Sequence, residues 1–293
     1  MFIKKRFEAK KRNEEEEVNQ QPDSSAQKPQ FDKEVQALKN QKDMPDLVNA
    51  LNNLTPDQLD LLELGFGNGT LADKMKWTEE AIPAKDLHPT QNEIDVGKSL
   101  SYQVNPADPE QQKKILANGP VTINLPLVVY DYNGTHYIVD GHHRWSQVFL
   151  LNPNCKINSI VFKNSAGDNP QDPADMLRDF QGAIAVANGG KVPSSKVEPG
   201  MNIFDWLKDG DDKLKDYLDK NITDKMVDVY QDYYNAPVSK NAVRNSILGN
   251  AGIMATSNKP IHNAPSRAVM PQTDTGNNAG LNVAKQGMTD IYG

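Results

Sequence analysis

Apolar residues follow two different spacings along this chain. From Phe31 to Leu64, and again from Met176 to Ala187 and from Ile203 to Tyr234, they recur at helical spacing, which marks one buried face of a helix. Between these regions, apolar and β-branched residues form short runs bounded by turn residues, as strands do. The pattern therefore predicts an α+β fold, in which a small mixed sheet with short helices is flanked by further helices.

The strongest local signal is a β-hairpin followed by a helix. The runs Leu125–Asp131 and His136–Asp140 are joined across Asn133-Gly134, a pair that favours the tight turn of a two-residue hairpin. A helix should follow from Gly141 and end before Asn152-Pro153. Its buried face is predicted to carry Trp145, Val148 and Phe149.

Composition divides the chain into five segments. The two ends are polar and hold too few large apolar residues to offset the entropy lost on ordering. The predicted segments are a disordered charged tail (1–30), a helical N-terminal segment (31–80), a compact α+β domain (81–164), a helical C-terminal region (165–254) and a flexible tail (255–293).

Charge and cysteine content exclude several classes of protein. The formal net charge is -7, which is the wrong sign for a protein held on nucleic acid by a general electrostatic field. With Cys155 as the single cysteine, an intramolecular disulfide and a multi-cysteine zinc cluster are excluded. The chain has no apolar run long enough to span a membrane and no apolar leader. We therefore expect no membrane partner and an intracellular, cytoplasmic protein.

Candidate chemistry gathers where the second hairpin strand meets the helix. There Asp140-Gly141 is followed directly by His142, His143 and Arg144. Unpaired N–H groups and the positive end of the helix dipole point to such a corner, and glycine lets a phosphate approach the backbone. Arg144 adds a planar fork of donors. The same sequence would also suit a capped helix with no ligand, and both interpretations stay open.

The order of these elements resembles the ParB/sulfiredoxin superfamily. The resemblance covers residues 81–164 and rests on Leu87–Gln91, a helix ending at Gly119, the hairpin and Ile138–Trp145. In that superfamily a Gly-x-x-Arg motif at a helix start binds nucleotide phosphates. Partition proteins carry Gly-Glu-Arg-Arg there, sulfiredoxins a Gly-Cys-His-Arg type, and ParB-like proteins regarded as nucleases, many of them from phages and plasmids, the Asp-Gly-His-His-Arg form found here.

The resemblance implies a set of site residues. The phosphate-binding residues would be Gly141, His142, His143 and Arg144, and the nucleotide contacts would be His88, Thr90 and Gln91. The ligand would be a nucleotide, ATP or CTP with Mg²⁺, or a DNA phosphate. Two departures limit the analogy. Position 142 holds no cysteine, which removes the thiol chemistry of sulfiredoxins, and the Asp-rich helices downstream include no basic helix-turn-helix reader.

A catalytic role would fall to Asp140, His142 and His143. The unperturbed pKa of histidine suits a general base as well as a phosphate donor. One metal ion cannot easily take both histidines, since consecutive side chains diverge by about 100° on a helix and about 180° on a strand. Asp140 with His142 is the better pair, and His88, Glu93 and Asp95 are the candidates for further ligands. Alternatively, one histidine caps the helix and the other packs in the protein interior, with no chemical role. The sequence does not identify which metal such a site would bind.

Two functions follow from these observations. The first is a module that binds nucleotide or nucleic-acid phosphate, with phosphodiester or nucleotide hydrolysis as a further activity open to it. The second is a catalytically silent structural or adaptor protein, for example a phage accessory or virion-associated factor. The segment Pro265–Pro271 would then be a docking peptide for a protein partner, and the location would be the host cytoplasm or the virion.

Overall fold

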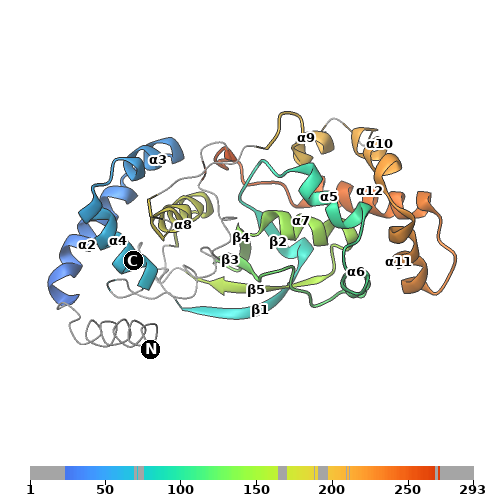
Figure 1. Cartoon of the computed structure of the whole chain (residues 1–293), viewed down its shortest axis with the longest axis horizontal. Helices are drawn as coiled ribbons and strands as arrows, with labels where there is room; N and C mark the ends of the chain where they lie inside the picture. Colours follow the sequence, from blue (N-terminus) through green and yellow to red (C-terminus); the bar gives the residue numbers. More distant parts are fainter. Residues whose placement is uncertain are drawn as a thin grey trace, which may run out of the picture.

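The fold is a five-stranded mixed sheet surrounded by helices, as the hydrophobic pattern predicts (Figure 1). The computed structural model describes residues 24–68, 71, 76–163, 170–187, 189–190, 197–208, 210, 212–267 and 270. The strands are β1 (Trp77–Pro83), β2 (Leu87–Pro89), β3 (Leu127–Tyr132), β4 (Thr135–Asp140) and β5 (Lys156–Phe162), in the spatial order β1-β5-β3-β4-β2. β3 pairs antiparallel with β4, and β5 antiparallel with β1, whereas the β2/β4 and β3/β5 pairs are parallel.

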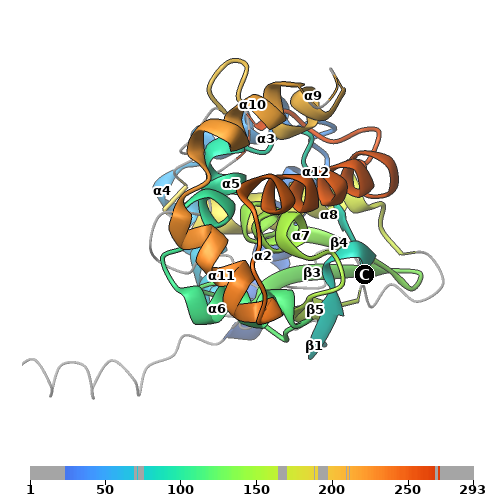
Figure 2. The ribbon, with the colours of Figure 1, turned by 90° about the vertical axis from the view of Figure 1, so that its right-hand side faces the viewer.

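The helices of the described residues fall into two groups. At one end of the molecule lie α2 (Ser24–Lys39), α3 (Met44–Asn52), α4 (Pro56–Asn68) and α8 (Pro173–Ala187). Around the rest of the sheet lie α5 (Val96–Val104), α6 (Pro109–Leu116), α7 (His142–Leu151), α9 (Ile203–Lys208), α10 (Asp212–Asn221), α11 (Asp224–Tyr234) and α12 (Lys240–Ser257), and a 3-10 turn, η1 (Ala84–Asp86), precedes β2. Figure 2 shows α7 lying between α12 and the sheet.

The predicted hairpin is confirmed, and its turn residues explain why it forms. Asn133 and Gly134 both have positive φ, 54° and 83°, as a type I′ turn requires. The Asp131 carboxylate accepts a hydrogen bond from the Gly134 N–H at 2.8 Å. The turn places Asp140 at the end of β4, directly before α7.

The two faces of the sheet belong to two different cores. In β3, Leu127 and Val129 pack into the core that contains α7, whereas Val128 and Tyr130 pack into the core shared with α8. This alternation is the period-2 geometry of a strand buried on both sides. The sheet therefore has an α7 side and an α8 side, and any residue of β2 or β4 can be assigned to one of them.

The ends of the chain differ from the predicted boundaries. Residues 1–23, most of the predicted charged tail, lie outside the described residues, and residues 24–30 begin α2. The boundary expected at 255 falls inside α12, whose last buried side chain is Met254. The chain then continues through residues 258–267 against β2 and the loop after it, and residues 271–293 are outside the described part.

The segment proposed as a docking peptide touches this chain itself. Arg267 and Met270 are buried, and Arg267 donates a hydrogen bond to the Gln91 side chain. Ala268, Val269 and Pro271 lie outside the described residues.

Candidate functional site

The strand–glycine–helix corner is present, and its geometry depends on Gly141. The φ of Gly141 is +104°, a conformation that side chains disfavour. A Cβ added there would collide with Leu127 and would lie 2.9 Å from Nη2 and 3.1 Å from Nε of Arg144. The glycine is therefore needed twice, once for the backbone conformation and once to let the Arg144 guanidinium lie over the start of α7.

The Arg144 guanidinium donates hydrogen bonds to nearby backbone carbonyls and also faces the corner at Gly141. Its Nη1 donates to the carbonyl oxygens of Leu125 at 2.9 Å and Pro126 at 3.1 Å, and its Nη2 donates to Asp140 Oδ2 at 2.6 Å. These three bonds use three of the five N–H donors of a guanidinium. Nε and the second hydrogen of Nη2 lie on the edge over Gly141 and have no hydrogen-bond partner among the described residues.

His142 is a buried, neutral imidazole. It is 3% exposed, and its Nε2 accepts a hydrogen bond from the Thr90 backbone N–H at 3.1 Å. A backbone N–H can only donate, so Nε2 carries no proton and the proton of the neutral ring is on Nδ1. Burial lowers the pKa of His142 well below 6.5, and the charges of three neighbouring side chains lower it further: Arg267, His143 and Arg144.

His143 points to a different element. Its Nε2 accepts the Asp95 backbone N–H at 3.1 Å, and Asp95 is the N-cap of α5, where its side chain accepts the Lys98 N–H. The two histidines thus diverge as their adjacent positions predict. One holds the loop after β2 and the other holds the start of α5.

The three expected nucleotide contacts are separated by the structure. His88 stacks near Tyr137, with ring centroids 5.7 Å apart, and lies on the α8 side of the sheet because its neighbour Leu87 packs in the α7 core. Thr90 and Gln91 follow β2 near the corner but are 0% and 5% exposed. Only Thr90 among the three contacts His142, by its N–H and at 3.3 Å by its Oγ1.

The described residues include no cluster of three or more side chains suited to hold a metal ion. Of the candidates named from sequence, Asp140 is bound to Arg144, and His88 lies on the α8 side of the sheet. Glu93 accepts a hydrogen bond from Ser266, and Asp95 caps α5. The metal site considered from sequence is therefore not assembled in this part of the chain.

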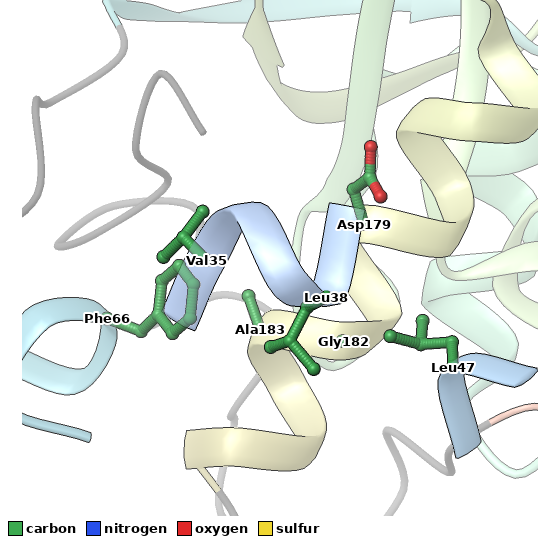
Figure 3. A pocket seen from close by; sticks show the side chains of 7 residues that line it. All are labelled: Val35, Leu38, Leu47, Phe66, Asp179, Gly182 and Ala183. Atoms are coloured by element: carbon green, nitrogen blue, oxygen red, sulfur yellow. The ribbon is translucent and has the colours of Figure 1, made fainter. Parts of the chain in front are cut away.

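A pocket elsewhere in the fold has a lining that does not suit a phosphate. Figure 3 shows it among α2, α3, α4 and α8, lined by Val35, Leu38, Leu47, Phe66, Asp179, Gly182 and Ala183. Its single charged lining residue, Asp179, is an acid, and the other lining residues are apolar. None of these lining side chains offers a positive charge or an N–H donor to a phosphate, so the corner at Gly141 remains the candidate site.

One residue near the corner was not predicted from sequence. Arg267, which the sequence analysis placed in a flexible tail, is 8% exposed and donates from Nη1 to Gln91 Oε1 at 2.9 Å. A lone arginine in an Asn/Pro-rich stretch carries no local signal of a site. Only the path of the chain after α12 brings it here.

Comparison with known proteins adds no relative. No family model, no curated protein and no solved structure matches the chain. The resemblance to the ParB/sulfiredoxin superfamily therefore stays a prediction that rests on the motif and on the order of the elements. In the described part of the chain, no helix combines the length and apolar character needed to cross a membrane.

The state of His142 predicts a pH dependence of stability. Because its folded pKa lies below 6.5, the unfolded chain takes up a proton first as the pH falls. This group's contribution to stability is full above pH 6.5 and is lost progressively below it, with a slope of up to about 1.4 kcal/mol per pH unit. Urea unfolding between pH 7.5 and pH 5 should show a shallower loss for His142→Gln than for the parent. His262→Gln, at an exposed position, is the control; an unchanged slope in His142→Gln would contradict the assignment.

Proposed function

We propose that this chain binds the phosphate of a nucleotide at the corner formed by Asp140, Gly141 and the first turn of α7. The observation that carries the proposal is the position of the Arg144 guanidinium, whose Nε/Nη2 edge lies over Gly141. That edge, together with the N-terminal N–H groups of α7, offers donors to phosphate oxygens. The ligands to test first are ATP and CTP with Mg²⁺, followed by DNA as a source of phosphate.

The proposal is for binding and does not include hydrolysis. Asp140 pairs with Arg144, and both histidines accept a backbone N–H through Nε2. These bonds leave neither histidine Nε2 free to take a proton from water. A protonated Nδ1 is a donor, which suits a phosphate oxygen better than it suits base catalysis.

The test is a calorimetric titration of ATP and CTP, each with and without Mg²⁺, into the full chain and into Arg144→Lys. Lysine keeps the positive charge but lacks the planar set of N–H donors that the guanidinium offers. A charge-assisted hydrogen bond is worth about 1.5–3 kcal/mol, so we expect affinity to fall by about 10- to 150-fold. Alanine is less suitable, since Arg144 also holds the carbonyls of Leu125 and Pro126.

Arg178→Lys is the matched control. Arg178 is also largely buried, and it bonds a backbone carbonyl, that of Lys42, and a carboxylate, that of Asp175, but it does so on α8. Equal affinity in the Arg144 and Arg178 variants would remove the assignment of the corner.

A structural or adaptor role is the second candidate, and a specific observation favours it. Three hydrogen bonds of Arg144 and one of each histidine already tie α7 to other segments: the chain before β3, the end of β4, the loop after β2 and the start of α5. A corner used only in this way would bind no nucleotide. Thermal unfolding of Arg144→Lys at a lower temperature, with no heat of nucleotide binding in the parent, would support this role.

A further inference from the structure

The two outer strands of the sheet differ in what lies beside them. β2 forms one edge, and the chain that follows α12 covers it. There Asn258 Nδ2 donates to the Leu87 carbonyl at 2.9 Å, and the next backbone bond runs from the Ile261 N–H to the Pro89 carbonyl at 3.2 Å. β1 forms the other edge, and among the described residues its strand partner is β5 alone. Figures 1 and 2 both show β1 at the outside of the fold. Such an edge presents backbone N–H and C=O groups with which another strand can pair.

The first part of β1 is exposed on both of its faces. Residues 77–81 are all exposed, and Trp77 is one of the large apolar side chains that reach the surface, at 37% exposure. Ile82 is buried in the α7 core. By strand alternation, Thr78 and Glu80 therefore point to the α7 side of the sheet and Trp77 to the α8 side. A partner strand can approach this part of β1 without displacing a helix.

Charged residues on β1 restrict which strand fits beside it. Lys76 directly precedes β1, and its side chain shares the α7 side with Thr78 and Glu80. In the part of the chain that the structure describes, Lys76 has no ion-pair partner. Glu80 Oε1 accepts a hydrogen bond from Thr78 Oγ1 at 2.8 Å. The nearby Lys163 is paired with Asp131, at 2.8 Å. Lys76 and Glu80 thus offer one cation and one anion to a partner on the same side of the sheet.

A second copy of β1 matches both charges at once. When two identical strands pair antiparallel about a two-fold axis, residues at equal distances on either side of the axis face each other. With the axis at Thr78, Lys76 of each copy faces Glu80 of the other, and the two threonines face each other. Opposite charges and threonine pairs are both favourable across strands. With the axis at Glu79 or at Glu80, two glutamates face each other, which is unfavourable. The charges therefore favour one register and oppose the next two.

We propose that the open edge of β1 is a dimer interface, at which two copies of this chain join their sheets antiparallel about Thr78. On the α8 side, Trp77 then lies diagonally across from its counterpart, within reach of an aromatic contact. Because the edge at β2 is covered, each copy has one open edge, and assembly ends at the dimer. β5 and β3 separate β1 from β4, so this interface is independent of phosphate binding at the corner.

Sedimentation of the full chain over a wide range of protein concentration tests the interface. The apparent mass should rise from that of one chain to that of two. Glu80→Lys places two lysines opposite each other in both symmetric pairs, and Lys76→Glu places two glutamates there. Each change should weaken the dimer by about 10-fold or more. The double variant Lys76→Glu/Glu80→Lys exchanges the charges and should restore the dimer, which a folding defect in either single variant would not allow.

Lys85→Glu is the matched control. Lys85 is an exposed lysine in η1, beside the covered edge of the sheet. Reversing its charge should leave the dissociation constant of the dimer unchanged. Circular dichroism of every variant shows whether the fold is retained.

Three results would overturn the proposal. A parent that stays monomeric at every concentration would show that β1 does not pair with its own copy and is open to another partner. A dimer that both single reversals leave intact, or that the double variant does not restore, would show that Lys76 and Glu80 do not face each other. Assemblies that grow beyond two chains would show that β1 is not the single open edge.

Discussion

Replacing Trp145 by alanine should lower the free energy of unfolding by about 3–5 kcal/mol, the usual cost of deleting a large buried aromatic side chain. Trp145 is fully buried in the α7 core and packs edge-on against Phe149 with ring centroids 5.4 Å apart. Its indole Nε1 donates to the carbonyl of Ala84 at 2.8 Å. The substitution therefore leaves both a cavity and an unpartnered carbonyl between α7 and η1.

Chemical denaturation followed by circular dichroism measures this effect. Trp145→Phe should lie between the parent and alanine, since it keeps most of the packing but loses the bond to Ala84. Tyr234→Ala is the exposed aromatic control, because Tyr234 is among the exposed large side chains. A Trp145→Ala curve that coincides with that control would show that α7 does not depend on this side chain.

Replacing Gly141 by alanine should be nearly as costly, about 2–5 kcal/mol. A side chain at a φ of +104° costs about 1–2 kcal/mol of backbone strain, and overpacking adds about 1–3 kcal/mol. The added Cβ would press on Leu127 and on the Arg144 guanidinium. We also expect nucleotide affinity to fall, because Arg144 would be pushed off the start of α7.

The control variant Gly134→Ala separates backbone strain from overpacking as causes of the expected loss of stability. Gly134 has a φ of +83° in the hairpin turn, but nothing lies within 4 Å of an added Cβ. This control should show the backbone strain alone, and the difference between the two variants measures the packing at the corner. If urea unfolding gave equal losses of stability for Gly141→Ala and Gly134→Ala, then Leu127 and Arg144 would move aside at no cost in free energy.

Short-range patterns were sufficient for the elements that carry the corner. Asn133-Gly134 predicts the hairpin because its turn needs two residues with positive φ. Asn152-Pro153 marks the end of α7, and the divergence of His142 and His143 follows from adjacent positions alone. These features depend on backbone geometry over a few residues, so the amino-acid sequence by itself determined the α+β class, the hairpin and the strand–glycine–helix order.

The tertiary structure decided what surrounds the corner. The sequence analysis placed residues after Ala255 in a flexible tail, yet Asn258 is buried under β2 and Arg267 contacts Gln91. It also grouped His88 with Thr90, and the strand alternation of β2 sends His88 to the other side of the sheet. Apart from Asp140, four positions before Arg144, the partners of Arg144, Thr90 and Arg267 lie from 18 to 176 positions away. Such contacts depend on how packed elements bring distant backbone polar groups together, and no local propensity or spacing encodes that path.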